Sequence, residues 1–316
     1  MKYRVLGGTG LRVSEVGLGA WFIGGMYGEV TVDEARAIIR RAVDLGINVF
    51  DTADVYGNGL SERILGEELM GYDAYVFTKV GYNIYEGKGG RHTQSFTPDY
   101  IKYAALQSIK RLGRRVNLLQ LHNPPLEVIR RSDIRETLLG LVKEGYVEHI
   151  GVALGPEVNV LSEGLAAMEF EYESIMFVFN ILEQEPARTL VRLGNGKVGL
   201  ITRVPHASNL LTSNFTLSFK PGDHRNLRNS EWLIRAKAIV DEYVKPISDE
   251  LGLTLSQLAL KYVLSYPIST VMITVTSVNE LEEYVKAVDG SYLNPSLVRR
   301  LEELYDNVVV RQLDST

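Results

Sequence analysis

The feature that most constrains the fold is an eightfold alternation of short apolar runs with segments of helical periodicity. No composition shift and no Pro/Ser-rich linker interrupts this pattern, which predicts one domain over residues 1–316. The predicted strands are 15–20, 48–50, 74–80, 116–122, 149–154, 175–180, 198–204 and 270–276.

Apolar strands that alternate with helices predict a parallel α/β sheet whose outer side is covered. Eight such units in about 300 residues fit a TIM (β/α)8 barrel, with a doubly wound open sheet as the main alternative. Before the first unit, residues 2–6 and 11–13 flank the turn GGTG and predict an N-terminal β-hairpin. Helix starts are predicted at Thr31, which has Glu34 three residues later, and at Thr97 before Pro98.

Charge and composition exclude several classes of partner. The net charge is −5 and basic residues form only short doublets, so nucleic acid is not expected as a partner. No apolar segment approaches membrane-spanning length and no secretory leader is evident, which predicts a cytoplasmic protein without a membrane partner. The absence of cysteine excludes disulfides, thiolate metal sites and a cysteine nucleophile. The sequence leaves the oligomeric state open.

Four polar residues fall at or just after the carboxyl ends of neighbouring predicted strands. Asp51 ends the second strand, Tyr56 follows it, Lys79 ends the third strand and His122 ends the fourth. In a barrel these ends meet around one mouth, where the chemistry of such folds is done. Each residue alone has an ordinary structural explanation, but a lysine that closes an apolar strand needs a charged partner.

Together these four groups are suited to reducing a carbonyl. A tyrosine with a pKa near ~10 is a poor acid, and a nearby ammonium such as that of Lys79 is expected to lower this pKa. Asp51 would keep the lysine charged, and a neutral His122 would orient the carbonyl oxygen. None of these side chains donates hydride, so a nicotinamide cofactor is required.

The motifs that contain these residues resemble the aldo-keto reductase family. They are FDTADVYGNGLSERILGEEL, FTKVG, LLQLHNPP and the opening YRVLGGTGLRVSEVGLGA, and the similarity runs over nearly the whole chain. The resemblance implies a TIM barrel whose floor is closed by an N-terminal hairpin, with NADPH or NADH across its top. It implies Tyr56 as general acid, Lys79 and Asp51 as the pair that tunes it, and His122 as the residue that orients the carbonyl.

The resemblance also implies a set of cofactor-binding positions. The segment VPHASNLLT is similar to the family's loop around the cofactor pyrophosphate, and Arg203 stands where many members stack an aromatic ring on the nicotinamide. Ala153 and Leu154 replace the family's Ser-Asn, which leaves Asn180 to hold the carboxamide. The cofactor-binding candidates in these regions are Gly19, Asn180, Arg203, Val204, His206, Ser208 and Leu210.

The segment after the last strand departs from the family. Thr276 stands at the position of a base that grips the 2′-phosphate, and Tyr284 at the position that faces adenine. Ser277 and Glu280 have the spacing of a helix cap that leaves backbone donors for an anion. Glu280 and Glu283 are expected to repel a 2′-phosphate unless a base such as Arg225 compensates, so NADH is expected to bind at least as well as NADPH, or both weakly.

The first loop contains glycines at 17, 19, 24 and 25 without the G-x-G-x-x-G spacing, so we expect them to permit close backbone approach. Trp21, Phe22 and Tyr82 are candidate substrate-binding residues or ordinary packing residues. Residues 82–97 and 205–232 are long polar loops, expected to act as lids or specificity elements or to be plain insertions.

The sequence therefore predicts an oxidoreductase that reduces an aldehyde or ketone, a sugar or small metabolite, with NAD(P)H. The sequence is compatible with two other functions. A metal-dependent hydrolase would draw ligands from Asp51, His122, His206 and His224, but no metal-binding spacing is present and no metal site is predicted. A regulatory protein that binds cofactor with little turnover, as potassium channel beta subunits do, is the alternative function.

Overall fold

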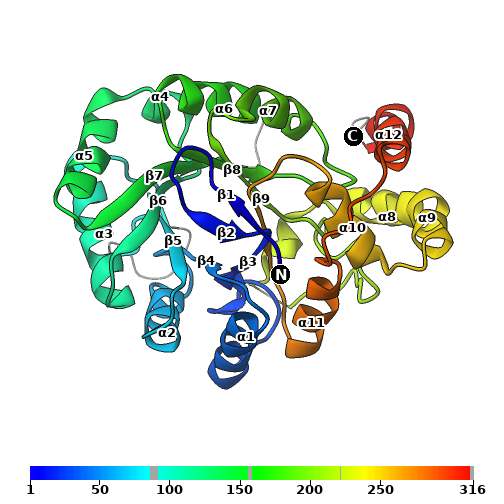
Figure 1. Ribbon diagram of the computed structural model, residues 1–316, viewed down its shortest axis with the longest axis horizontal. Helices are drawn as coiled ribbons and strands as arrows, with labels where there is room; N and C mark the ends of the chain where they lie inside the picture. The colour runs from blue at the N-terminus through cyan, green and yellow to red at the C-terminus, as the bar shows by residue number, and fades with distance from the viewer. Residues whose placement is uncertain (86–91, 156–158, 221, 314–316) are drawn as a thin grey trace.

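Eight parallel strands form the closed barrel at the centre of the computed structural model (Figure 1), which describes residues 1–85, 92–155, 159–220 and 222–313. Their order around the barrel is β10-β3-β4-β5-β6-β7-β8-β9, so the predicted (β/α)8 barrel is confirmed over the open sheet. The strands are β3 Val16–Gly19, β4 Val49–Asp51, β5 Tyr75–Val80, β6 Val116–His122, β7 Val147–Ala153, β8 Ser174–Val178, β9 Gly199–Arg203 and β10 Thr270–Ile273.

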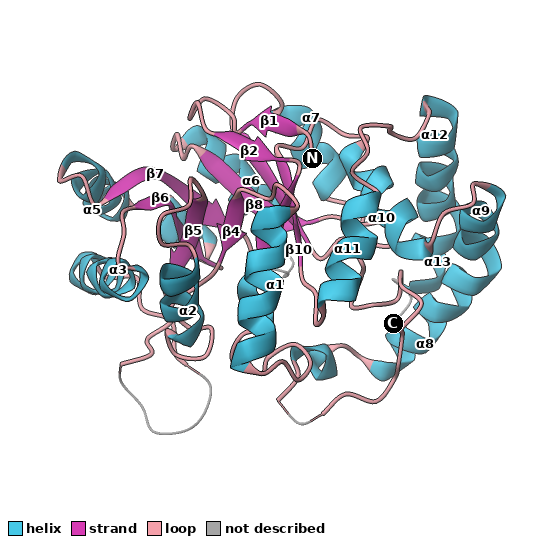
Figure 2. Ribbon diagram, turned by 60° about the horizontal axis from the view of Figure 1, so that its bottom comes forward, coloured by secondary structure: helices cyan, strands magenta, loops and turns pink. Residues whose placement is uncertain are grey.

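Helices connect successive strands and surround the barrel (Figures 1 and 2). The predicted starts of two of them are confirmed, because Thr31 forms a capping box with Glu34 and Thr97 caps the helix that Pro98 opens. The helices are α1 Val32–Asp44, α2 Leu60–Glu68, α3 Pro98–Leu112, α4 Leu126–Ile129, α5 Ser132–Lys143, α6 Val160–Glu169, α7 Ala187–Gly194, α8 Ser230–Ile239, α9 Lys245–Glu250, α10 Leu255–Leu264, α11 Val278–Lys286, α12 Pro295–Leu304 and α13 Val310–Leu313.

One side of the barrel carries additional helices. Figure 1 shows α8, α9 and α12 gathered outside α10, which buries nearly all of its residues. Helix α8 continues through the π-helical stretch Val240–Val244 into α9. The excursion between β9 and β10 therefore forms a second layer over this part of the barrel.

The N-terminal hairpin closes one end of the barrel, as predicted (Figure 2). Its antiparallel strands are β1 Tyr3–Val5 and β2 Arg12–Ser14. Leu6 and Leu11 belong to a cluster of buried side chains that also contains inward residues of the barrel strands. A Cβ on Gly7, which has a φ of +51°, would lie 2.3 Å from the nitrogen of Gly199. The hairpin turn therefore lies directly against the backbone of the barrel floor.

Within the described part of the chain, no helix combines the length and the apolar character needed to span a bilayer.

Candidate active site

The carboxyl ends of β4 and β5 bring a buried ion pair to the barrel mouth. The Nζ atom of Lys79 lies 2.5 Å from Oδ2 of Asp51, and both side chains are almost completely buried. The same ammonium donates to the carbonyl oxygen of Thr52 at 2.8 Å. These contacts fix the lysine head group at the point where the two strands end.

Tyr56 and His122 complete the group of four catalytic candidates that were predicted from their positions at or just after strand ends. The chain turns after β4, where the Tyr56 N–H donates to the carbonyl of Ala53. The Tyr56 ring centre lies 5.2 Å from Nζ of Lys79 and 6.0 Å from the His122 ring. The structure thus brings all four predicted catalytic residues together.

Burial acts against the charge of both partners of the ion pair: it raises the pKa of Asp51 above its ordinary value, against the opposing charge of Lys79. Burial opposes the charge of Lys79, but Asp51 and Tyr56 together hold the pKa of the lysine above its ordinary value. Burial raises the pKa of Tyr56, whereas Lys79 acts in the opposite direction. Lys79 thus lowers the pKa of Tyr56 as expected, but burial raises it by more, so the pKa of the tyrosine lies above its ordinary value. Tyr56 is a protonated phenol at neutral pH.

His122 is neutral at the same pH. Burial and the positive charges of Lys79 and Arg203 lower its pKa well below the ordinary value. Its ring packs edge-on against Tyr82 at 4.9 Å, and its Nδ1 atom has no hydrogen-bond partner among the described residues. A neutral imidazole of this kind can exchange hydrogen bonds with a carbonyl oxygen without neutralising the site.

Gln120 is a site residue that the sequence reasoning missed. Its Nε2 atom donates to Oδ1 of Asp51 at 3.3 Å, so the carboxylate is held from two sides. Gln120 precedes His122 by two positions in β6, and residues two apart share a strand face. This spacing was the signal that could have identified it.

Two of the three candidate substrate-binding residues line the mouth. Trp21 lies 6.1 Å from the Tyr56 ring and 4.2 Å from His224, while Tyr82 contacts His122. Phe22, by contrast, is completely buried in the hydrophobic core. The short 3-10 helix Ala20–Phe22 directs adjacent side chains differently, so Phe22 is a packing residue.

Two loops close over this side of the mouth, and we call their contact the clasp. It joins residues 26–29 with residues 209–224. The Gly28 N–H donates to Oδ2 of Asp223 at 2.9 Å, and the His224 N–H donates to the carbonyl of Met26 at 3.0 Å. A hydrogen bond between Tyr27 and Asn209 and an ion pair between Glu29 and Lys220 add to it.

The two predicted loops are only partly irregular. Residues 205–232 include the 3-10 helix His224–Leu227 and the start of α8 at Ser230, and residue 221 lies outside the described residues. In the loop 82–97, residues 86–91 also lie outside them. Its base is held by a bridge between Tyr82 and Gln94, whose amide donates to the carbonyl of Asn123 at 2.8 Å.

Close backbone approach in the first loop is confirmed at Gly24 but not at Gly25, where no atom lies within 4 Å of an added Cβ. A Cβ on Gly24 would lie 2.6 Å from the backbone of Gly57, directly after Tyr56. Gly19 pairs with Asp51 in the barrel, and a Cβ there would lie 3.2 Å from the carbonyl oxygen of Ile273. Gly24 thus lets the first loop lie against the loop that carries the tyrosine, whereas Gly19 lets β3 lie close to the end of β10.

The turn after β9 has the properties of an anion-binding loop. Positive φ angles, which strain residues other than glycine, occur at Val204, Ala207, Ser208 and Asn209. The backbone N–H groups of His206, Ser208 and Asn209 donate to no described residue. Leu210 is fully buried and can contribute only packing or backbone.

A buried histidine adds to the evidence for a ligand at this turn. The His206 ring lies 4.1 Å from that of Tyr284, and its Nε2 atom has no partner among the described residues. Strained backbone with free N–H groups suits phosphate oxygens. These residues therefore fit the diphosphate of a nicotinamide dinucleotide.

Asn180 does not offer the free amide that the sequence suggested. Its Nδ2 atom donates to the carbonyl of Val204 at 3.0 Å and to Glu183 at 2.8 Å. Its Oδ1 atom accepts from the N–H groups of Leu182 and Glu183. The amide is used to tie the end of β8 to the turn after β9, so it is a support for that turn.

The start of α11 also differs from expectation. Ser277 caps the helix by accepting from the Glu280 N–H, as predicted. The carboxylate of Glu280, however, accepts from both the N–H and the hydroxyl of Thr276, at 2.7 and 2.9 Å. One backbone donor at this helix start, the Thr276 N–H, is therefore already occupied by a protein carboxylate.

The other two charged candidates near α11, Glu283 and Arg225, also already have partners within the protein. Glu283 accepts from the hydroxyls of Thr254 and Ser256, so it faces α10. Arg225 lies between the rings of Tyr27 and Phe219 and donates through Nε and Nη2 to Asp223, at 2.9 and 2.7 Å. The base suggested as compensation for Glu280 thus already has a carboxylate partner.

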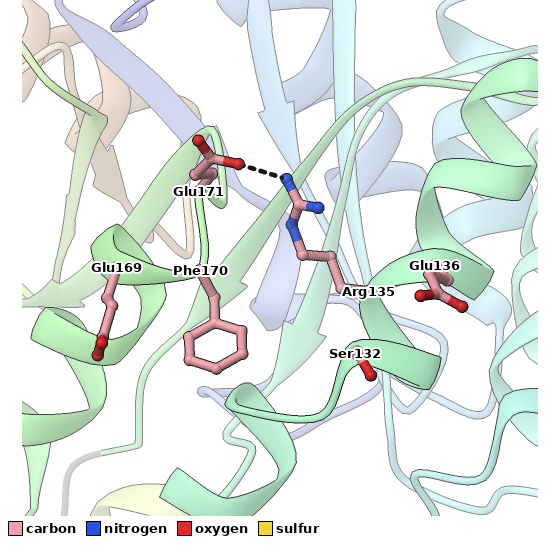
Figure 3. Close-up of a pocket in the computed structure, with 6 residues that line it drawn as sticks. All are labelled: Ser132, Arg135, Glu136, Glu169, Phe170 and Glu171. Atoms are coloured by element: carbon pink, nitrogen blue, oxygen red, sulfur yellow. Dashed lines mark hydrogen bonds and ion pairs between the residues drawn. The ribbon is translucent and has the colours of Figure 1, made fainter.

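An open hollow of about 390 Å³ lies elsewhere, between α5 and the end of α6 (Figure 3). Arg135 and Glu171 form an ion pair at its edge. Its lining residues are Ser132, Arg135, Glu136, Glu169, Phe170 and Glu171. None of the four catalytic candidates contributes to it. In the described residues, no cluster of three or more His, Asp or Glu side chains has the arrangement of a metal site.

The buried histidines predict acid sensitivity of the fold. Burial lowers the pKa of His206 to about 3, whereas an unfolded histidine titrates near ~6.5. As pH falls below ~6.5 the unfolded chain gains a proton that the folded ring does not accept, so stability falls. We expect His206 to account for a loss of about 2 kcal/mol between pH 7 and pH 5.

Urea unfolding at pH 7, 6 and 5 measures this loss. The variant His206→Leu should lose correspondingly less stability over the same range. His92→Gln, at a partly exposed position, is the matched control and should retain the wild-type pH dependence. An unaltered pH dependence in His206→Leu would contradict the assignment.

Comparisons with known proteins agree with this geometry. The model described as "Aldo/keto reductase family" matches residues 15–306. The chain is 30% identical over 329 residues to the protein named "Probable voltage-gated potassium channel subunit beta" from Arabidopsis thaliana, with 96% of each chain covered. It is 28% identical to the "Uncharacterized oxidoreductase YqkF" of Bacillus subtilis, again with 96% of each covered. The solved structure of aldo-keto reductase AKR11C1 from Bacillus halodurans in its holo form superposes with a TM-score of 0.79, at 26% identity and 96% coverage of both chains.

Proposed function

The chain belongs to the aldo-keto reductase family, and from this premise we propose that it reduces an aldehyde or ketone to an alcohol with NADH or NADPH. The observation that carries the proposal is the buried Lys79–Asp51 pair beside a protonated Tyr56 and a neutral His122. Few other reactions need a phenol, an ammonium and a neutral imidazole around one point.

Each residue has a defined part in this proposal. The hydroxyl of Tyr56 donates the proton that the carbonyl oxygen takes up, and Lys79 stabilises the phenolate that remains. Asp51, held by Gln120, keeps the ammonium charged and in place. His122 orients the carbonyl oxygen by a hydrogen bond. The bound nicotinamide supplies the hydride.

The surrounding residues would hold the two reactants. We assign the turn with Val204, His206, Ser208 and Leu210 to the cofactor diphosphate, since it has free N–H groups. Gly19, which pairs with Asp51 across β3 and β4, is assigned to the nicotinamide end. The substrate would lie between the Trp21 and Tyr82 rings, which are the aromatic walls next to Tyr56 and His122.

A carbonyl panel tests the proposed reaction. Purified protein is mixed with NADH or NADPH and with aliphatic, aromatic and sugar aldehydes and ketones, and cofactor oxidation is followed by absorbance. Carbonyl-dependent oxidation is expected with at least one class of compound. No turnover with any carbonyl, despite saturable cofactor binding, would contradict the enzyme assignment.

One specific observation favours the alternative that this is a regulatory protein, namely the 30% identity to a protein named as a potassium channel beta subunit. The same panel separates the two functions. A regulatory protein binds cofactor saturably and shows a negligible steady-state rate, whereas the reductase turns over.

The residues around the start of α11 lead to an expectation about the preference between NADH and NADPH. Glu280 accepts from both Thr276 donors, and Arg225 is paired with Asp223, so neither Thr276 nor Arg225 offers a free donor to a 2′-phosphate. A charge-assisted contact contributes about 1.5–3 kcal/mol, or roughly 10- to 150-fold in affinity. We expect NADH to bind at least as well as NADPH, or both to bind weakly.

Fluorescence titration with each cofactor measures this preference directly. Glu280→Gln should improve NADPH binding relative to NADH, because it removes a negative charge from the α11 start. Glu282→Gln, on the same helix but paired with Arg41, is the control and should leave the ratio unaltered. A tenfold preference of the wild type for NADPH would contradict the expectation.

A further inference from the structure

Arg203 brings a second positive charge to the barrel mouth. It is the last residue of β9, and its Nη2 atom donates to the carbonyl oxygen of Leu154 at 2.9 Å, just after β7. The guanidinium therefore reaches across the end of β8. Because Arg203 ends its strand of the closed parallel barrel, it stands at the same carboxyl-end mouth as Asp51, Lys79 and His122.

No described carboxylate forms an ion pair with Arg203. The two acidic residues whose charges reach it are engaged elsewhere. Asp51 pairs with Lys79 at 2.5 Å, and Glu183 pairs with Arg228 at 2.6 Å. The described residues of the mouth thus contribute two positive charges, from Lys79 and Arg203, against one negative charge from Asp51.

An unpaired, half-buried guanidinium is a suitable anion receptor. Arginine remains charged in proteins, and its planar set of donors fits the two oxygens of a carboxylate or phosphate. Burying a charge without a counter-ion is costly, so a bound anion would stabilise the site. The aromatic walls formed by Trp21 and Tyr82 carry no negative charge that could supply this partner.

Resting on the proposed function, we infer that Arg203 binds an anionic group of the substrate, a carboxylate or a phosphate. The preferred substrates are then carbonyl compounds with a negative charge near the carbonyl group. Arg203 is a specificity-determining residue in this inference. The sequence had placed it against the nicotinamide instead, and the two assignments make different predictions.

Matched pairs of anionic and neutral aldehydes distinguish a role of Arg203 in substrate binding from a role in cofactor binding. One pair is 4-carboxybenzaldehyde and its neutral methyl ester, and the other is glyceraldehyde 3-phosphate and glyceraldehyde. We expect the wild type to favour an anionic member by roughly tenfold to 100-fold in kcat/KM, the value of a charge-assisted hydrogen bond. In Arg203→Met this ratio should fall to about one, and in Arg203→Lys it should be intermediate.

The charge-matched control is Arg300→Met. Arg300 is exposed on α12 and pairs with Glu250 at 3.1 Å. This variant loses the same charge far from the mouth, so its anion-to-neutral ratio should equal that of the wild type. The ratio cancels any effect of Arg203 on cofactor binding or on the hydride step, because both members of a pair share those steps.

The outcomes are distinct. A preference confined to the carboxylate pair or to the phosphate pair supports the inference and identifies the anion. Equal losses for both members in Arg203→Met, with the ratio unaltered, overturn it in favour of a cofactor role. Calorimetric titration with both members of each pair, without cofactor, provides a readout independent of turnover.

This binding measurement also separates the inference from the proposed function. If the protein reduces no carbonyl but binds the acid at least tenfold more tightly than the ester, in an Arg203-dependent way, the anion site stands and the reductase proposal fails. If neither the carboxylate nor the phosphate compound binds more tightly than its neutral partner, the anion site is wrong, whatever the turnover.

Discussion

Replacement of Tyr56 by phenylalanine should reduce kcat/KM for any carbonyl substrate by about 10²–10⁴-fold, the contribution of general acid catalysis. The hydroxyl is the only group removed, and the ring can keep its place 6.1 Å from Trp21 and 6.0 Å from His122. The fold and cofactor affinity should therefore be retained. Steady-state kinetics, a cofactor titration and thermal unfolding of the same preparation measure the three quantities.

The matched control for this change is Tyr75→Phe. Tyr75 begins β5 and packs against the cluster at the barrel floor, away from the mouth where β5 ends. Loss of its hydroxyl should leave kcat/KM within about threefold of the wild type, a difference of less than 1 kcal/mol. Near-normal turnover of Tyr56→Phe would exclude this tyrosine as the proton donor.

Replacement of Lys79 by methionine should remove activity and destabilise the fold. Without the ammonium, a phenolate at Tyr56 has no adjacent positive charge from this strand, so we expect a loss of at least about 10²-fold in kcat/KM. Asp51 would remain buried without its cation, and breaking a buried pair from one side costs about 3–5 kcal/mol. Kinetics and urea unfolding at pH 7 measure both effects.

A double variant tests the cause of the instability. Asp51→Asn in the Lys79→Met background removes the stranded carboxylate, so stability should recover by about 1–3 kcal/mol while activity does not. Unfolding of the single variant and the double variant at the same urea concentration would show that the Lys79–Asp51 pair is not what stabilises this region.

The barrel and the four catalytic candidates could be predicted because local rules determine them. Apolar runs and helix caps define each unit, and the end of a strand tells where a polar side chain emerges. Asp51, Lys79 and His122 needed no more information than that. Gln120 was predictable by the same strand periodicity, but it was overlooked between two leucines.

The errors have a common physical origin in partners distant along the chain. Asn180 was expected to hold a cofactor, yet its amide bonds to Val204 across the neighbouring strand. Glu283 was expected to face a phosphate, yet it bonds to hydroxyls of α10. Phe22 was predicted together with Trp21 because the two are adjacent in sequence. The short 3-10 helix that contains them turns Phe22 into the core and Trp21 toward the mouth. Such partners depend on packing that sequence periodicity does not describe.

The balance of charges on Tyr56 was misjudged for a related reason. The sequence identifies Lys79 as a neighbour, but it does not give the extent of burial around the phenol. In the structure burial has the larger effect on the tyrosine pKa. Contact partners could thus be inferred from strand ends, whereas the strength of each electrostatic effect required the packed environment.

The N-terminal hairpin stabilises the barrel at the end opposite to the mouth, so stability and ligand specificity depend on different residues. Leu6 and Leu11 pack at the closed end of the barrel, whereas Tyr56 and Arg203 belong to the open end. Effects of substitutions at well-separated sites are usually additive. Stability gained by better packing of the floor can therefore offset the destabilisation that accompanies new residues at the mouth. A lineage or a laboratory selection could in this way change which ligands the mouth accepts while the barrel itself stays intact.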